Sequence, residues 1–241
     1  MKKSVAAAII GLAVAAGSSI EARAEASEGR WFSPLGIGLF APVQLPYIAC
    51  DVYGVRVDCI MGWNDNVYGV DLTPVAICSS DFAGIEAGAF NWTGSCAWGV
   101  QFGALANVVG DKTIALQFAG VANVVHGDGA GLQMSLVNYA NSFVGAQIGA
   151  IDWNSAASIG AQVGVATVDI EEYTGFSAGL VNYAGKVTGF QLGAVNAADE
   201  ATGLQIGVIN GVNRMHGVQI GLVNVIAEGP LPIMVVANAS F

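Results

Sequence analysis

The fold of this chain is decided by Gly217-Val218-Gln219-Ile220-Gly221-Leu222-Val223-Asn224, a unit that recurs along most of the sequence. Near copies occupy residues 203–210 and 189–196. The first six positions alternate between small or polar residues and apolar residues. This alternation is typical of a β-strand with one polar and one apolar face, so the unit predicts an all-β protein.

The lead glycine of this unit recurs with a steady period. The spacings are 15, 15, 15, 16, 16, 14, 15, 15, 14, 14 and 14 residues, which is the signature of a repeat protein. We number each repeat from its lead residue as position 1. The lead residues are Gly54, Gly69, Gly84, Gly99, Ala115, Gly131, Gly145, Gly160, Gly175, Gly189, Gly203 and Gly217.

Two architectures fit such an amphipathic period. One is an antiparallel transmembrane β-barrel of about 14 strands, in which each 14–16-residue repeat is one strand and the apolar face meets lipid. A strand of about 11 residues tilted near 45° would cover about 25 Å, the apolar band of an outer membrane. The other is a β-solenoid of about 13 coils with the apolar faces inward. The even spacing favours the solenoid, but we expect the barrel because of the aromatic residues.

Tyr and Trp residues cluster outside positions 1–8 of the repeats, as in the interfacial girdles of membrane barrels. The alternative is that they fill the corners of turns. The chain also ends on Phe241, a terminal aromatic of the kind that barrel-assembly machinery recognises. The expected interfacial residues are Tyr53, Tyr68, Trp92, Trp98, Tyr139, Trp153, Tyr173 and Tyr183.

The composition indicates an exported protein with much apolar surface. The 241 residues have a mean hydropathy of +0.59, and only 11% of them are charged. The net charge of -10 argues against a nucleic-acid partner, because phosphate contacts need clustered Lys and Arg. Lys2 and Lys3, the apolar run from Val5 to Gly17 and a small-x-small site at residues 22–24 predict a signal peptide over residues 1–24. A lead-in over 25–34 and a single β-repeat domain over 35–241 would follow.

Few residues are candidates for chemistry. Arg56, Asp71 and Glu86 occupy position 3 in three successive repeats, where Gln is usual, and we expect them side by side on the polar face. In a barrel they would line the lumen, and the alternative is a structural ion-pair ladder. Position 8 is usually Asn, expected to satisfy local backbone groups. Export makes disulfides possible for the four cysteines, Cys50, Cys59, Cys78 and Cys96.

The repeats resemble those of a bacterial family of exported surface-repeat proteins whose function is not established. The resemblance is carried by residues 203–210 and 217–224, by the opening segments 52–57 and 67–72, and by the ending 232–241. It implies exported, surface or outer-membrane β-structure and supplies no catalytic residues. We therefore expect a structural or passive-pore protein of the outer membrane, without catalysis, metal or cofactor. The alternative is a secreted or surface-attached solenoid that serves as an interaction or adhesion surface.

Overall fold

The computed structural model describes residues 31–241. The chain divides into two units, Met1–Phe32 and Ser33–Phe241, and all the repeats lie in the second. The predicted signal peptide and most of the predicted lead-in lie outside the described residues. Strand β1 (Phe32–Phe40) begins inside the stretch expected as lead-in.

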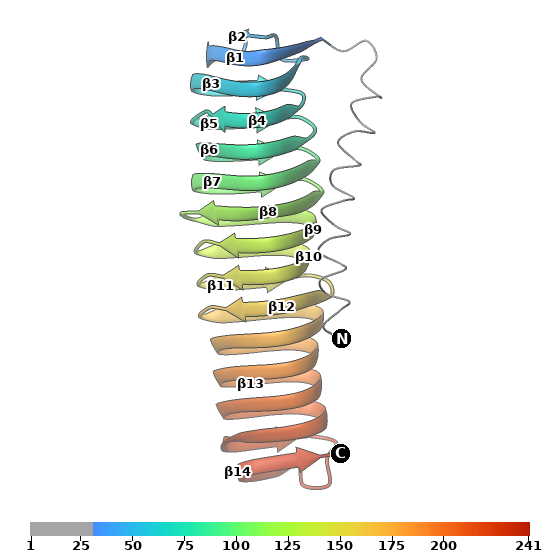
Figure 1. Cartoon of the computed structure of the whole chain (residues 1–241). Helices are drawn as coiled ribbons and strands as arrows, with labels where there is room; N and C mark the ends of the chain where they lie inside the picture. Colours follow the sequence, from blue (N-terminus) through green and yellow to red (C-terminus); the bar gives the residue numbers. More distant parts are fainter. Residues whose placement is uncertain (1–30) are drawn as a thin grey trace. The chain divides into compact units, whose positions relative to one another are not determined.

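The described chain is all-β, as the alternation predicts, and residues 31–241 contain no helix. The strands follow one another down a single stack (Figure 1). After β1 they are β2 (Val43–Leu45), β3 (Asp51–Asn64), β4 (Val67–Leu72), β5 (Val75–Cys78), β6 (Phe82–Thr93), β7 (Cys96–Val109), β8 (Lys112–Ala119), β9 (Ala122–Met134), β10 (Val137–Ile148), β11 (Ile151–Asn154), β12 (Ser158–Val163), β13 (Ala166–Ile226) and β14 (Ile233–Ser240).

The predicted barrel is wrong, because neighbouring repeats run parallel. Gly54 pairs with Gly69, Gly69 with Gly84 and Gly84 with Gly99, each in a parallel ladder. Parallel neighbours joined by short turns require the chain to circle back once per repeat, whereas a membrane barrel alternates strand direction. The protein is a β-solenoid of stacked parallel coils, so the alternative is the correct architecture.

One repeat forms one flattened coil with two strand segments. In the repeat led by Gly69, β4 is followed by a bend at residues 73–74, then β5, then a turn at residues 79–81. The first segments of successive coils pair with one another, as do the second segments. Two parallel sheets therefore face each other across a narrow interior, joined along one edge by the bends and along the other by the turns.

The polar face of the repeat points inward, which corrects the apolar-inside orientation expected for a solenoid. The position-3 glutamines are at most 2% exposed, and the asparagines of the position-8 row are fully buried. Glutamines of neighbouring coils lie over one another in register, as Gln101 does over Gln117, and Ser177 interrupts the column next to Gln162. Because stacked amides can bond one another at every step, burying them leaves few polar groups without a partner.

The two amide ladders run in opposite directions. In the glutamine ladder the later coil donates: Gln205 Nε2 bonds Gln191 Oε1 at 2.7 Å, and Gln219 Nε2 bonds Gln205 Oε1 at 2.8 Å. In the asparagine ladder the earlier coil donates, as Asn196 Nδ2 does to Asn210 Oδ1 at 2.7 Å. The side-chain dipoles of the two columns therefore oppose each other, which lowers the cost of aligning so many amides.

Two apolar columns complete the interior. One comes from the residue two places before the lead glycine, for example Val67 and Phe82, and the other from position 10 or its equivalent, for example Val125 and Ala140. Amides and apolar side chains together fill the space between the sheets. The passive-pore role was expected for a barrel with an open lumen, and in this solenoid side chains fill the interior instead.

Strands of opposite direction close both ends of the stack. β14 pairs antiparallel with the last coil, with Gly217 opposite Ser240, and β2 pairs antiparallel with β1. Phe241, expected to serve barrel assembly, lies edge-on to His216 with 6.4 Å between ring centroids. That role was expected for a barrel, an architecture that the parallel coils contradict.

Replacing Asn196 by alanine is expected to lower the free energy of unfolding by about 2 kcal/mol. Asn196 Nδ2 also donates to the Ile206 carbonyl at 2.8 Å, and its Oδ1 accepts from Asn182 at 2.7 Å, so the change leaves buried partners unpaired. Urea unfolding measures the loss. Asn213→Ala is the control, because that side chain is exposed, and its effect should stay within about 0.5 kcal/mol. Equal losses in the two variants would contradict the role of the ladder.

Candidate functional site

The predicted charge cluster exists, but it lies in the interior rather than on a lumen. Arg56, Asp71 and Glu86 stack in register, and each side chain is fully buried. Arg56 Nε donates to Asp71 Oδ2 at 2.9 Å, and Arg56 Nη2 bonds the same oxygen. Arg56 Nη1 donates to Asn64 Oδ1 at 3.2 Å and to the Ile77 carbonyl at 3.0 Å. The guanidinium is thus satisfied within the core, which corresponds to the structural ion-pair alternative.

Glu86 is the member of this cluster without a matching cation. Gln101 Nε2 donates to its Oε2 at 2.8 Å, while its Oε1 is buried without a hydrogen-bond partner. Burial, reinforced by the charge of Asp71, raises the pKa of Glu86 to about 8. At neutral pH the side chain is therefore largely a neutral acid at the end of the glutamine ladder.

A second pair of buried acids lies in the middle of the stack. Asp152 takes an asparagine position and accepts from Asn138 Nδ2 at 2.7 Å. Asp169 accepts from Asn154 at 2.9 Å and from Gln162 at 3.0 Å. Burial raises the pKa of Asp152 to about 6 and that of Asp169 to about 7. Asp152 replaces an amide of the asparagine row, whereas Asp169 lies at position 10, in register with Asn154, and both carboxyls are bonded within the interior.

All four cysteines are free thiols, so the structure contains none of the possible disulfides. Cys78 is buried, and its Sγ lies 2.9 Å from the Asp81 carbonyl oxygen. Burial raises the pKa of the Cys78 thiol to about 12, which makes it a poor nucleophile. Cys96 is also buried, Cys50 is half-buried and Cys59 is exposed.

Exposed apolar side chains line the edge formed by the bends, which we call the apolar edge. It consists of exposed large apolar side chains at positions 4, 6 and 7, or their equivalents in the longer repeats. Leu222 is 65% exposed and Leu180 is 60% exposed. Its members are Leu72, Phe102, Leu105, Val121, Met134, Leu136, Ile148, Ile151, Val163, Val165, Leu180, Val181, Leu192, Val208, Ile209, Ile220, Leu222 and Val223.

A shallow hollow of about 440 Å³ interrupts this edge. Ala87, Ala104 and Ala119 form part of its lining, and Phe102 and Met134 also contribute to it. Phe102 and Phe118 stack at 5.2 Å between ring centroids. The lining has no ionisable side chain, so the hollow suits hydrocarbon rather than a polar ligand.

Most of the predicted interfacial aromatics form rows on the outer faces of both sheets. Tyr53, Tyr68 and Trp98 lie at the position before the lead glycine, and the first two rings stack at 4.9 Å. The row on the second sheet lies at position 9. That row contains Trp92, Tyr139, Trp153 and Tyr183, together with Trp63, which is in register with them.

Tyr173 does not belong to these rows, which corrects its expected place. It is 1% exposed and points into the interior. Its hydroxyl donates toward the carbonyls of Gly160 at 2.8 Å and Phe176 at 2.7 Å. The residue falls two places before the lead glycine, and that place always faces inward.

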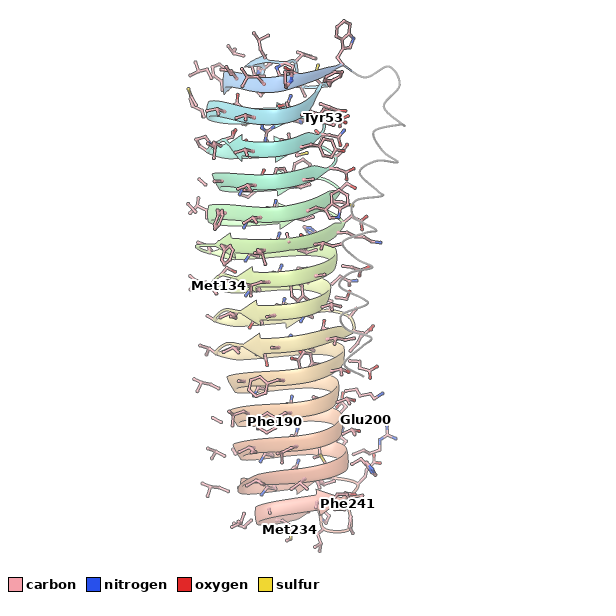
Figure 2. All side chains as sticks on the ribbon, in the orientation of Figure 1. Tyr53, Met134, Phe190, Glu200, Met234 and Phe241 are labelled. Carbon is pink, nitrogen blue, oxygen red and sulfur yellow. The ribbon has the colours of Figure 1, made fainter. Side chains whose placement is uncertain are left out.

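Ionised side chains gather along the edge formed by the turns, which we call the charged edge. Glu200 pairs with Arg214, and Lys186 Nζ lies 3.2 Å from Glu172 Oε1. Figure 2 shows Glu200 and Met134 on opposite edges of the stack. Within residues 31–241, the exposed Asp, Glu, Lys and Arg side chains all lie on or beside the turns. This segregation was readable in the sequence, since positions 2, 4, 6, 7 and 9 of the repeats contain no Asp, Glu, Lys, Arg or His.

No protein-family model, no curated protein and no solved structure matches this chain. Among residues 31–241 there is no group of His, Cys, Asp and Glu that could hold a metal ion. In the same part of the chain, no helix is long and apolar enough to cross a membrane.

Proposed function

We propose that this chain is an exported β-solenoid without catalysis that acts as an interaction surface at the outside of the cell. The observation that supports this proposal is the apolar edge, which continues over the coils from Leu72 to Val223. A protein surface seldom keeps an apolar patch of this length without a partner. The acids with raised pKa values, such as Glu86 and Asp169, are buried in the interior and do not reach the surface.

Export is tested by expressing the full chain with its N-terminal segment in a Gram-negative bacterium. We expect the protein outside the cytoplasm, with its N-terminus at Glu25 when read by mass spectrometry. A variant with Lys2 and Lys3 changed to glutamate, together with Leu12→Arg, is the matched control and should stay uncleaved in the cytoplasm. Unprocessed wild-type protein confined to the cytoplasm would contradict the proposal.

A further inference from the structure

We infer that the apolar edge inserts into one leaflet of a lipid bilayer, with the solenoid axis lying along the membrane surface. This inference rests on the proposed function and names the partner of that surface. Three features of the solenoid favour lipid as the partner: the placement of charge, the two aromatic rows and the backbone hydrogen bonds of the bends.

Charge is placed as a membrane surface requires. Glu172, Lys186, Glu200 and Arg214 are on the charged edge. Figure 2 shows Glu200 on the opposite side of the stack from Met134 of the apolar edge. Ionised groups cost several kcal/mol in hydrocarbon, so a lipid-facing edge must lack them, whereas an edge that binds protein usually has a polar rim. The apolar edge lacks such groups in every coil from Leu72 to Val223.

Each face of the stack has one aromatic row. Trp98 is on the first sheet and Trp153 on the second, each between the apolar edge and the charged edge. The distance from these rows to the bends is about three to five residues, or roughly 10–16 Å at ~3.3 Å per residue. One leaflet contributes about 15 Å of hydrocarbon. Trp and Tyr prefer the headgroup level, so the rows place the rest of the edge in the acyl region.

The backbone of the bends is already satisfied, which lipid demands of any inserted segment. Leu180 N donates to the Val165 carbonyl at 2.9 Å, and Val165 N donates to the Ala150 carbonyl at 2.9 Å. Ala150 N donates in turn to the Leu136 carbonyl at 2.9 Å. Bends in most proteins expose backbone N–H and C=O groups to water. Here these backbone groups bond the neighbouring coil, so the apolar edge can leave water without losing hydrogen bonds.

The binding is expected to be independent of lipid charge. The chain has a net charge of -10. Among residues 31–241, the exposed cations are paired or lie on the charged edge, away from the inserted side chains. Vesicles of phosphatidylcholine alone should therefore bind the protein. Raising the salt concentration should leave the bound fraction unchanged within about a factor of two, unlike a polybasic peripheral protein.

The test is flotation of the purified chain with phosphatidylcholine vesicles. Leu180→Asp combined with Leu222→Asp should lower the partition coefficient at least about tenfold, because two inserted side chains become charged. Ile170→Asp is the matched control, since Ile170 is 46% exposed but lies beside the charged edge, and its partition should match the wild type. Circular dichroism and the melting temperature verify that each variant folds.

The remaining outcomes separate this inference from the proposed function. If the chain does not float and sediments as a dimer that the double variant dissociates, the lipid inference fails and the interaction surface stands. If it neither floats nor associates, both fail. Flotation that the double variant does not change would also overturn the inference, because another part of the molecule would then bind the lipid.

Discussion

Replacing Gly203 by alanine is expected to destabilise the solenoid by on the order of 3 to 5 kcal/mol. Gly203 has a φ of +131°, a backbone conformation that residues with a side chain rarely adopt. A Cβ there would lie 2.0 Å from the Gly189 carbonyl oxygen, in the coil before it. Because that oxygen belongs to the backbone of a rigid ladder, neither coil can yield without loss of hydrogen bonds. Thermal and urea unfolding measure the effect.

Gly211→Ala is the matched control for this change, because it lies in the same repeat. No atom lies within 4 Å of the point that a Cβ of residue 211 would occupy, and Gly211 has no positive φ. Its replacement should change stability by less than about 1 kcal/mol, and in the stabilising direction, since alanine restricts the unfolded chain. A similar loss in both variants would show that the lead position is not special.

Ala115 is the one lead residue of the repeats that has a side chain. It stands between two 16-residue spacings and does not have a positive φ, whereas its neighbours Gly99 and Gly131 do, at +115° and +119°. Repeat length alone does not set this difference, because Gly99 also leads a 16-residue repeat and keeps a positive φ. The positive φ occurs at the lead glycines, a conformation that a residue with a side chain rarely adopts.

The repeat and the strands could be predicted from the sequence, but the direction of the faces could not. An alternating strand has the same pattern whether its apolar side meets lipid, a core or an external partner, so residues such as Gln219 and Ile220 do not reveal which is inside. Burying Gln219 is favourable only because Gln205 stacks on it in register, and that contact exists only in parallel coils. The buried face could therefore not be predicted without knowing whether neighbouring strands run parallel or antiparallel.

The sequence also could not show where the aromatic residues lie in the fold. Their absence from positions 1–8 is real, but it predicts a girdle only if those positions are the centre of one long strand. In a coil the remaining places include outward-facing positions near the turns, as for Trp98 and Trp153. Tyr173 breaks the pattern because a one-residue shift moves a side chain from the outer face to the interior.

Replacing Glu86 by glutamine is expected to stabilise the protein by on the order of 2 to 4 kcal/mol at a pH of about 8.5 and above. The introduced amide would extend the glutamine ladder: its Oε1 would accept from Gln101, and its Nε2 would donate to the neighbouring carboxylate, Asp71. The wild-type side chain instead leaves Oε1 without a partner and must be ionised in a dry interior at high pH.

The stabilisation by Glu86→Gln is expected to grow as pH rises. Burial raises the pKa of Glu86 from 4.5 to about 8, so the folded protein holds a proton that the unfolded chain releases. The free energy of unfolding of the wild type therefore falls as pH rises from about 4.5 to about 8. The Glu86→Gln variant lacks this loss and retains the smaller declines from Asp152 and Asp169. At a pH of about 4 the gain over the wild type should shrink to under about 1 kcal/mol.

Urea unfolding at pH values of about 4 and about 8.5 checks the prediction, with Glu171→Gln as the control. Glu171 is exposed beside a turn, so its replacement should change stability by less than about 0.5 kcal/mol at either pH. A Glu86→Gln variant less stable than the wild type at the higher pH would mean that the ionised carboxylate is stabilised by Arg56. In that case Arg56 would be shared between Asp71 and Glu86, and the buried cluster would be a charged triad instead of an ion pair beside a neutral acid.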